Sequence, residues 1–291
     1  MMLSKSPAER IFDVSNALLL VLLGVVALYP LYYVLIVSVS SGMAVARGEV
    51  KLVPVQLTLG PYRTMIRDPY FFRSFLNTLK YTVVGTVVNL AMSCLCAYPL
   101  SIRSFSGNKA FTGFIVFTMF FSGGLIPTYL VVKSFGLLDS LWAIVLPAAI
   151  STWNMIIIRT FFQGIPQSLR ESAQIDGAND VFIFLRIILP LSLPVLATMT
   201  LFYASGHWNS FFPELIYLSE KSKYPMQLIL RNMLISEQMS EQYADILQQT
   251  DIAPTTLKYA AVMLSTVPIL LVYPFLQRYF VKGVMVGSLK G

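Results

Sequence analysis

Long apolar runs dominate the chain, and shorter polar stretches separate them. A helix of about 20 apolar residues crosses a hydrocarbon core of about 30 Å, and several runs reach that length. They cover residues 15–40, 74–101, 109–133, 140–162, 190–217 and 257–281. The runs are continuous rather than alternating, which disfavours a membrane β-barrel. The pattern predicts an all-α, polytopic membrane protein with about six transmembrane helices, organised as one domain over residues 1–291.

Composition supports this class. The chain has 12% charged and 56% hydrophobic residues, whereas a soluble domain carries about 25% charged residues. The first apolar stretch, from about Ala17 to Val39, exceeds the roughly 7–15 residues of a signal-peptide core, so we expect a retained span. The net charge of +7 is typical of contact with anionic lipid headgroups, and no nucleic-acid motif is present.

Three long polar connections lie between the runs, at residues 41–73, 163–190 and 218–256. An even number of spans places both termini on the same side of the membrane. Lysine and arginine are divided almost evenly between the two sides, so charge favours a cytoplasmic N-terminus only slightly. The connection 163–190 is the most informative one, because its polar residues must lie outside the bilayer and contact something there.

The connection 163–190 is predicted to form two short helices joined at a glycine. Ser168 and Glu171 have the spacing of a capping box at the start of a helix. Gly177 interrupts this helix, as expected of a helix end. Pro190 is expected to end the second helix, whose apolar residues are Val181, Phe182, Phe184, Leu185 and Ile188. Composition alone would equally allow a solvated loop with an interfacial helix.

The order of residues in this connection resembles the coupling motif of permeases from ATP-binding-cassette (ABC) importers. That motif begins Glu-Ala-Ala, continues to Asp-Gly-Ala, and ends with Ile-x-Leu-Pro. Ser172 replaces the usual alanine, one small residue for another. The residues in register are Glu171, Ala173, Asp176, Gly177, Ala178, Ile187, Leu189 and Pro190.

Other segments resemble the carbohydrate branch of that family, which is similar to the maltose transporter. They are residues 159–166 before the motif, 208–213 with the sequence Trp-Asn-Ser-Phe-Phe-Pro, and the C-terminal residues 282–291. Residues 121–130 and 224–231 are similar to a subgroup linked to oligosaccharides from plant wall, pectin or alginate. The resemblance covers nearly the whole chain.

The resemblance implies a type I ABC importer permease fold (MetI-like), with a cytoplasmic coupling-helix loop. It implies ATP-driven import of an oligosaccharide, expected to be acidic and to contain uronate. The implied partners are a second, different permease chain, two ATPase subunits and an extracytoplasmic sugar-binding protein that contacts residues 41–73 and 218–256. The implied location is a bacterial inner membrane, with both termini cytoplasmic. The implied ATPase contacts are Glu171, Ser172, Ala173, Asp176, Gly177 and Ala178.

The chain itself is not expected to be an enzyme. It has no G-x-x-x-x-G-K-[ST] sequence, so ATP and magnesium are expected on the partner ATPase, and no cofactor or catalytic residue here. Cys94 and Cys96 have no histidine nearby, so they predict packing rather than a metal site. Glu214 is a rare carboxylate in the apolar runs, and with His207 it leaves open a stand-alone secondary carrier or channel. A purely structural subunit is a third alternative.

Polar and aromatic residues within the spans are candidates for a translocation path. Tryptophan faces can stack on sugar rings, and asparagine or histidine can hydrogen-bond their hydroxyl groups. The same residues would also suit hydrogen-bonded packing between helices, and His207 could act as a proton relay. Lys80 either extends to the outer interface or faces the path as a cation for an anionic sugar. The candidates are His207, Trp208, Asn209, Trp153, Asn154 and Lys80.

Overall fold

The computed structural model describes residues 7–235 and 253–288, with side chains up to Leu271 in the last helix. Within these ranges the regular structure is helical. Contacts divide the chain into two compact units. The first comprises Met1–Asp68 with Asn232–Thr266, and the second comprises Pro69–Arg231 with Val267–Gly291.

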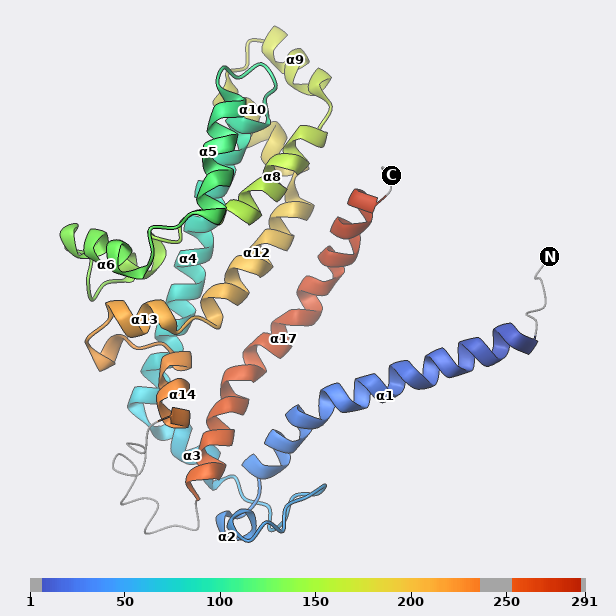
Figure 1. Cartoon of the computed structure of the whole chain (residues 1–291), viewed down its shortest axis with the longest axis vertical. Helices are drawn as coiled ribbons and strands as arrows, with labels where there is room; N and C mark the ends of the chain where they lie inside the picture. Colours follow the sequence, from blue (N-terminus) through green and yellow to red (C-terminus); the bar gives the residue numbers. More distant parts are fainter. Residues whose placement is uncertain (1–6, 236–252, 289–291) are drawn as a thin grey trace. The chain divides into compact units, whose positions relative to one another are not determined.

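The first unit contains the long helix α1 (Pro7–Ser38), α2 (Gly42–Ala46), α3 (Gly60–Arg67) and the first part of α17 (Pro254–Ser288). Figure 1 shows α1 as a long blue helix. Its buried residues are confined to its last turn, where Ile36 and Val37 pack with Ala44 and Val50. Most of α1 is therefore apolar and exposed, the pattern of a helix whose surroundings are lipid or another chain.

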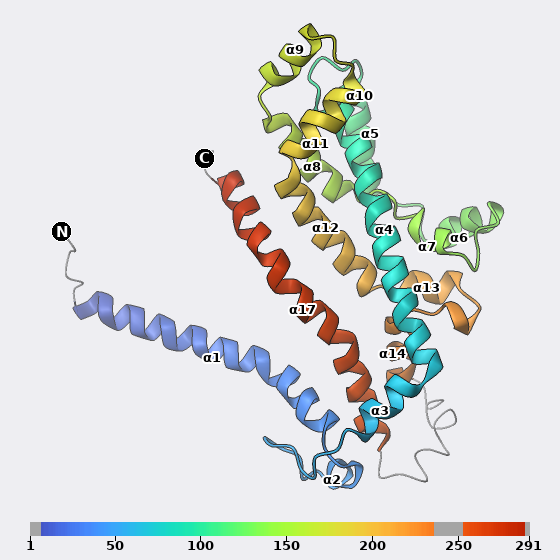
Figure 2. The ribbon, with the colours of Figure 1, turned by 180° about the vertical axis from the view of Figure 1, so that it is seen from behind.

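The second unit is built around α4, which packs against α12 and α8 (Figures 1 and 2). Small residues on its buried positions, such as Gly85, Ser93 and Ala97, allow helices to approach closely. Its helices are α4 (Pro69–Ser101), α5 (Asn108–Phe120), α6 (Leu125–Ser134), α7 (Leu141–Val145), α8 (Thr152–Gly164), α9 (Gln167–Ile175), α10 (Asp180–Ile183), the π-helix η1 (Phe184–Ile188), α11 (Leu189–Leu191), α12 (Leu193–Trp208), α13 (Phe212–Tyr217), the 3-10 helix η2 (Lys221–Lys223) and α14 (Met226–Ile235), which continues past Arg231.

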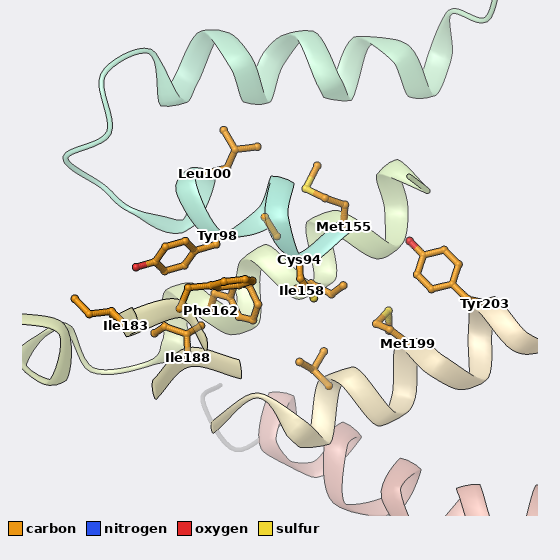
Figure 3. Packing of buried hydrophobic residues seen from close by; sticks show 13 residues of the cluster. Cys94, Tyr98, Leu100, Met155, Ile158, Phe162, Ile183, Ile188, Met199 and Tyr203 are labelled. Atoms are coloured by element: carbon orange, nitrogen blue, oxygen red, sulfur yellow. The ribbon is translucent and has the colours of Figure 1, made fainter. Parts of the chain in front are cut away.

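The main hydrophobic core of this unit lies at the end of α4 that is near α10 (Figure 3). Met155, Ile158 and Phe162 of α8 belong to one buried cluster with Tyr98 of α4 and with Ile183 and Ile188 from the segment that follows Gly177. The connection 163–190 is therefore part of the packed fold rather than a free loop, because its second half supplies side chains to this core.

Three of the predicted spans are confirmed as long apolar helices, α1, α4 and α17. The other three runs are not single helices. Residues 109–133 form α5 and α6, which meet at 114°, and 140–162 form α7 and α8. Residues 190–217 include α12 and α13. In addition, α12 meets the preceding helical segment, Asp180–Leu191, at a bend of 80°. Counting each bent pair as one span, the described residues offer up to five spans by length and composition.

The breaks have local causes that a hydropathy average does not register. Gly124, at a positive φ of 85°, follows Ser122 and Gly123 between α5 and α6. This conformation suits glycine and ends a regular helix. Pro147 lies between α7 and α8, where proline interrupts helical hydrogen bonding.

Candidate functional site: the coupling loop and the contact between α4 and α12

Helix α9 ends in a specific turn at Gly177. The N–H of Ala178 donates to the carbonyl of Ala173 (2.9 Å), and the N–H of Gly177 donates to that of Gln174 (3.1 Å). This pair of bonds is the Schellman motif, which requires a left-handed residue after the helix. Gly177 provides it with a φ of +81°. The structure thus confirms the predicted helix end at Gly177.

Two alanines of the motif join this turn to the core. Ala173 and Ala178 are half-buried and pack against the core of Figure 3. Asn179 then starts α10, since its side-chain oxygen accepts from the N–H of Phe182 at 2.8 Å. Glu171, Ser172 and Asp176 are exposed. The loop therefore separates residues that hold its shape from residues free to contact another protein.

Two local expectations for this loop are wrong. Ser168 does not cap α9, which begins after Pro166, and Glu171 instead accepts from the side-chain amide of Gln167 at 2.8 Å. Pro190 does not end the second helix, because it lies in the first turn of α11 and the break comes at Ser192. The apolar residues of the second helix divide into two groups: Phe184 and Ile188 are buried, while Val181, Phe182 and Leu185 are exposed. A π-helix from 184 to 188 changes which residues face the core.

A polar contact joins α12 to α4 through His207. Its Nε2 lies 2.6 Å from Oδ1 of Asn89, a residue that is almost fully buried. The amide nitrogen of Asn89 donates to the carbonyl of Ala148 at 2.5 Å, between α7 and α8. One asparagine thus connects three parts of the second unit, in the manner of interhelical polar contacts in membranes.

The His207 ring occupies space left by a glycine. A Cβ added at Gly85 of α4 would overlap the imidazole ring. The next residue, Trp208, is buried and meets Phe75 edge to face, with ring centroids 6.1 Å apart. The pair His207 and Trp208 therefore packs α12 onto α4, as one of the two alternatives for these residues predicts.

The other path candidates have different surroundings. Asn209 is exposed, donates to the carbonyl of Ser205 at 2.9 Å and lies 3.4 Å from the side chain of Gln227. Trp153 is 63% exposed in the first turn of α8, and Asn154 is half-buried beside it. Lys80 is exposed on α4. The hydrogen bonds that involve His207 and Asn209 include none to Trp153, Asn154 or Lys80.

Sequence reasoning missed Gly85 and Asn89, which together hold His207. Asn89 had a detectable signal, since an amide in the middle of an apolar run usually marks an interhelical contact. Gly85 had no such signal, because its role is to leave space for the His207 ring, which is more than 100 residues away in the sequence. Neither local pattern nor composition contains that information.

A second missed group lies toward the other end of α4, around residues 219–226, here called the rim. The side-chain amide of Asn77 donates to the carbonyls of Ser222 (2.9 Å) and Tyr224 (3.2 Å). The Tyr81 hydroxyl donates to the carbonyl of Lys223 at 2.7 Å. Asp139 accepts from the backbone N–H groups of Ser219 (2.6 Å) and Glu220 (3.1 Å). Side chains thus hold the rim by its backbone. Within the rim Lys223 pairs with Glu220 at 2.8 Å and Met226 is buried, while Ser219, Glu220 and Lys221 are exposed.

The pH dependence of the rim should follow Asp139. The backbone N–H groups of Ser219 and then Glu220 stabilise its carboxylate and lower its pKa. A group with a lowered folded pKa contributes stability that is complete above its unfolded value of about 3.9 and is lost as the pH falls through the folded value. We expect hydrogen exchange at the Ser219 and Glu220 amides, corrected for intrinsic rates, to accelerate as the pH falls below about 4.

The matched variants for this prediction are Asp139→Ala and Asp139→Asn. The alanine variant should show fast exchange at both amides and no dependence on pH beyond the intrinsic one. The asparagine variant keeps one acceptor oxygen, so its exchange rates at the two amides should lie between those of the unaltered chain and those of Asp139→Ala. The same pH response in Asp139→Ala as in the unaltered chain would show that Asp139 does not hold the rim.

Among the described residues, no group of three or more histidine, cysteine, aspartate or glutamate side chains is placed to hold a metal ion. The features that the described residues do show are breaks in apolar helices, an interhelical polar contact and a pair of short helices joined at Gly177. Long apolar helices, broken spans and a loop built into the core define a polytopic membrane permease.

The chain belongs to the family described as the inner membrane component of binding-protein-dependent transport systems, whose model matches residues 80–286. It is 43% identical to protein LplC of Bacillus subtilis over 284 residues. This match covers 98% of this chain and 96% of LplC. It is 42% identical to the polygalacturonan/rhamnogalacturonan transport system permease YtcP of the same organism, over 97% and 99% of the two chains.

A solved structure has the same fold. It is a chain of a bacterial ABC transporter involved in the import of the acidic polysaccharide alginate, with a TM-score of 0.91 and 36% sequence identity. The match covers 96% of this chain and 100% of that one. This chain is therefore an ABC importer permease, a multi-pass membrane protein of a transport system.

Proposed function

We propose that this chain is one of two membrane-spanning subunits of an ATP-driven importer of acidic, uronate-containing oligosaccharides. The observation that carries the coupling part is the loop from Gln167 to Asn179. Its Schellman turn and half-buried alanines hold it to the core, while Glu171, Ser172 and Asp176 remain exposed. A compact projection anchored in this way can transmit the movement of a partner to the spans.

The partner at this loop is proposed to be an ATPase subunit, with ATP and magnesium bound there. A second permease chain, a second ATPase subunit and an extracytoplasmic sugar-binding protein complete the proposed complex. The loop 163–190 and both termini are then cytoplasmic, and the rim lies on the outer side. In this arrangement Asp139, Asn77 and Tyr81 support the rim by its backbone and present its side chains to the binding protein.

The substrate class is supported by the relatives. One is a permease named for polygalacturonan and rhamnogalacturonan transport, and the structural neighbour belongs to a transporter of the acidic polysaccharide alginate. Both kinds of polymer carry carboxylates. The exposed Lys80 on α4 is a cation of the kind that such a substrate would favour, and Trp153 and Asn209 are exposed groups that can contact sugar rings and hydroxyls.

The alternative of a stand-alone carrier gains no support from its key residues. Glu214 is buried and accepts from the hydroxyl of Ser210 at 2.9 Å, and His207 is bonded to Asn89. These are separate contacts rather than a relay between two titratable groups, so proton coupling has no evident route through them.

The test is purification of this chain with its partners, followed by uptake in proteoliposomes. We expect an ATPase and a second permease to copurify, and labelled oligogalacturonate to enter only with ATP and the binding protein. A neutral oligosaccharide of the same length is the control for the acidic class. Uptake by this chain alone without ATP would overturn the proposal, and equal uptake of the neutral sugar would overturn its substrate part.

A further inference from the structure

One ion pair links the two helices of the coupling loop across the Gly177 turn. Nη2 of Arg170 in α9 lies 3.0 Å from Oδ1 of Asp180, the first residue of α10. The Arg170 side chain is 22% exposed, whereas that of Asp180 is 61% exposed. Nε of Arg170 is buried and has no hydrogen-bond partner among the described residues. The contact with Asp180 is thus the ion pair that compensates a largely buried guanidinium.

Helix α9 has few other attachments to the fold. None of its residues reaches full burial. Ala173 packs against the core, and the turn at Gly177 and Ala178 joins it to α10. At its other end α9 follows Ile165, which packs against the core, and Pro166. Between these two attachments most residues of α9 are exposed, so few contacts oppose a tilt of α9 relative to α10. The pair Arg170–Asp180 joins the helices on either side of the Gly177 turn and opposes that movement.

We infer that Arg170 and Asp180 are positioning residues that lock α9 and α10 into one rigid body, so that force applied to α9 reaches the core and the spans. This inference rests on the proposed function. The second helix leads directly into the core residues Ile183, Phe184 and Ile188. If the ion pair is broken, α9 can move with its partner while α10 stays in place, and ATP is hydrolysed without transport.

The alternative is that the ion pair matters only for folding. Removing the partner of a largely buried guanidinium lowers stability, so a purely structural role predicts a loss of assembled complex and an unchanged ratio of sugar imported to ATP hydrolysed. A positioning role predicts the opposite, an assembled complex with a changed ratio. The ratio of transport to hydrolysis therefore separates the two roles.

The experiment uses the complete complex in proteoliposomes with the sugar-loaded binding protein, and measures uptake and ATP hydrolysis together. We expect Arg170→Gln and Asp180→Asn each to lower the sugar imported per ATP by about tenfold, within the range of coupling between distant sites. The exchanged pair, Arg170→Asp with Asp180→Arg, should recover most of that loss. Arg103→Gln, which removes an exposed arginine from the α4–α5 turn, is the charge-matched control.

The outcomes separate this inference from the proposed function. If the unaltered complex shows no ATP-driven uptake, the proposed function fails. If it transports and both single variants keep the normal ratio, the positioning role is wrong. If the singles are impaired and the exchanged pair stays equally impaired, each residue acts through a contact of its own, and the inference is overturned. Arg170→Gln retains most of the side chain, so the complex is expected to assemble. The yield of complex on gel filtration checks this before the ratio of sugar imported to ATP hydrolysed is measured.

Discussion

Replacing Gly177 by valine is expected to lower binding-protein-dependent uptake by at least about tenfold, at equal amounts of protein in the membrane. The left-handed backbone at this position costs an L-residue about 1–2 kcal/mol. That cost corresponds to roughly a 5- to 30-fold change in the population of the native turn. The valine variant would relieve the strain by leaving this conformation, and the bonds from Gly177 and Ala178 to α9 would be lost. Uptake of labelled oligosaccharide in cells or proteoliposomes measures the effect.

Gly177→Asn is the matched control, because asparagine tolerates the left-handed conformation far better than valine. Among the residues that the structure describes, nothing lies within 4 Å of a Cβ added at Gly177. If the backbone is the cause, the asparagine variant should keep most of its activity. If asparagine is as damaging as valine, a partner surface must approach the glycine closely instead. Normal uptake in Gly177→Val would contradict any role of this turn in coupling.

Replacing Gly85 by alanine is expected to destabilise the packing of α12 against α4 by about 1–3 kcal/mol or more, since it overfills a closely packed contact. The added Cβ would overlap the His207 ring, so the ring must move and lose its bond to Asn89. Thermal unfolding in detergent, with the amount of folded protein in the membrane, measures the loss. Gly206→Ala is the control on the neighbouring helix, because no described residue lies within 4 Å of a Cβ added there.

A double variant tests whether Gly85 acts through His207. His207→Ala removes the ring and one interhelical bond, for which membrane proteins show losses of about 0.6–2 kcal/mol. Adding Gly85→Ala to that variant should cost much less than in the unaltered chain, because the overlap no longer exists. If the two losses simply add, the close contact between the two residues is not what makes Gly85 necessary. Reduced uptake in His207→Ala with unchanged stability would instead favour a role in the translocation path.

These two sites differ in how far the sequence reveals them. Glu171, Asp176 and Gly177 form a local pattern, and the turn at Gly177 follows from bonds between residues no more than five positions apart. Such a structure can be predicted from a short stretch. The polar face of the loop and its helix end were predicted correctly, whereas the Ser168 cap and the stop at Pro190 were wrong. The π-helix after α10 places Phe184 and Ile188 in the core, and the local pattern does not contain that packing.

The sequence by itself determined the membrane class, the long helices α1, α4 and α17, and the coupling loop, because apolar length and local turn chemistry act over neighbouring residues. Only the tertiary structure decided that three apolar runs are broken, that Gly85 makes room for His207, and that Arg170 pairs with Asp180 across a turn. Each of these depends on where a chain segment meets another. The hydropathy average of a segment is the same whether its helix continues or bends. The role of a glycine in an apolar run depends on which side chain packs against it, and the sequence does not show that.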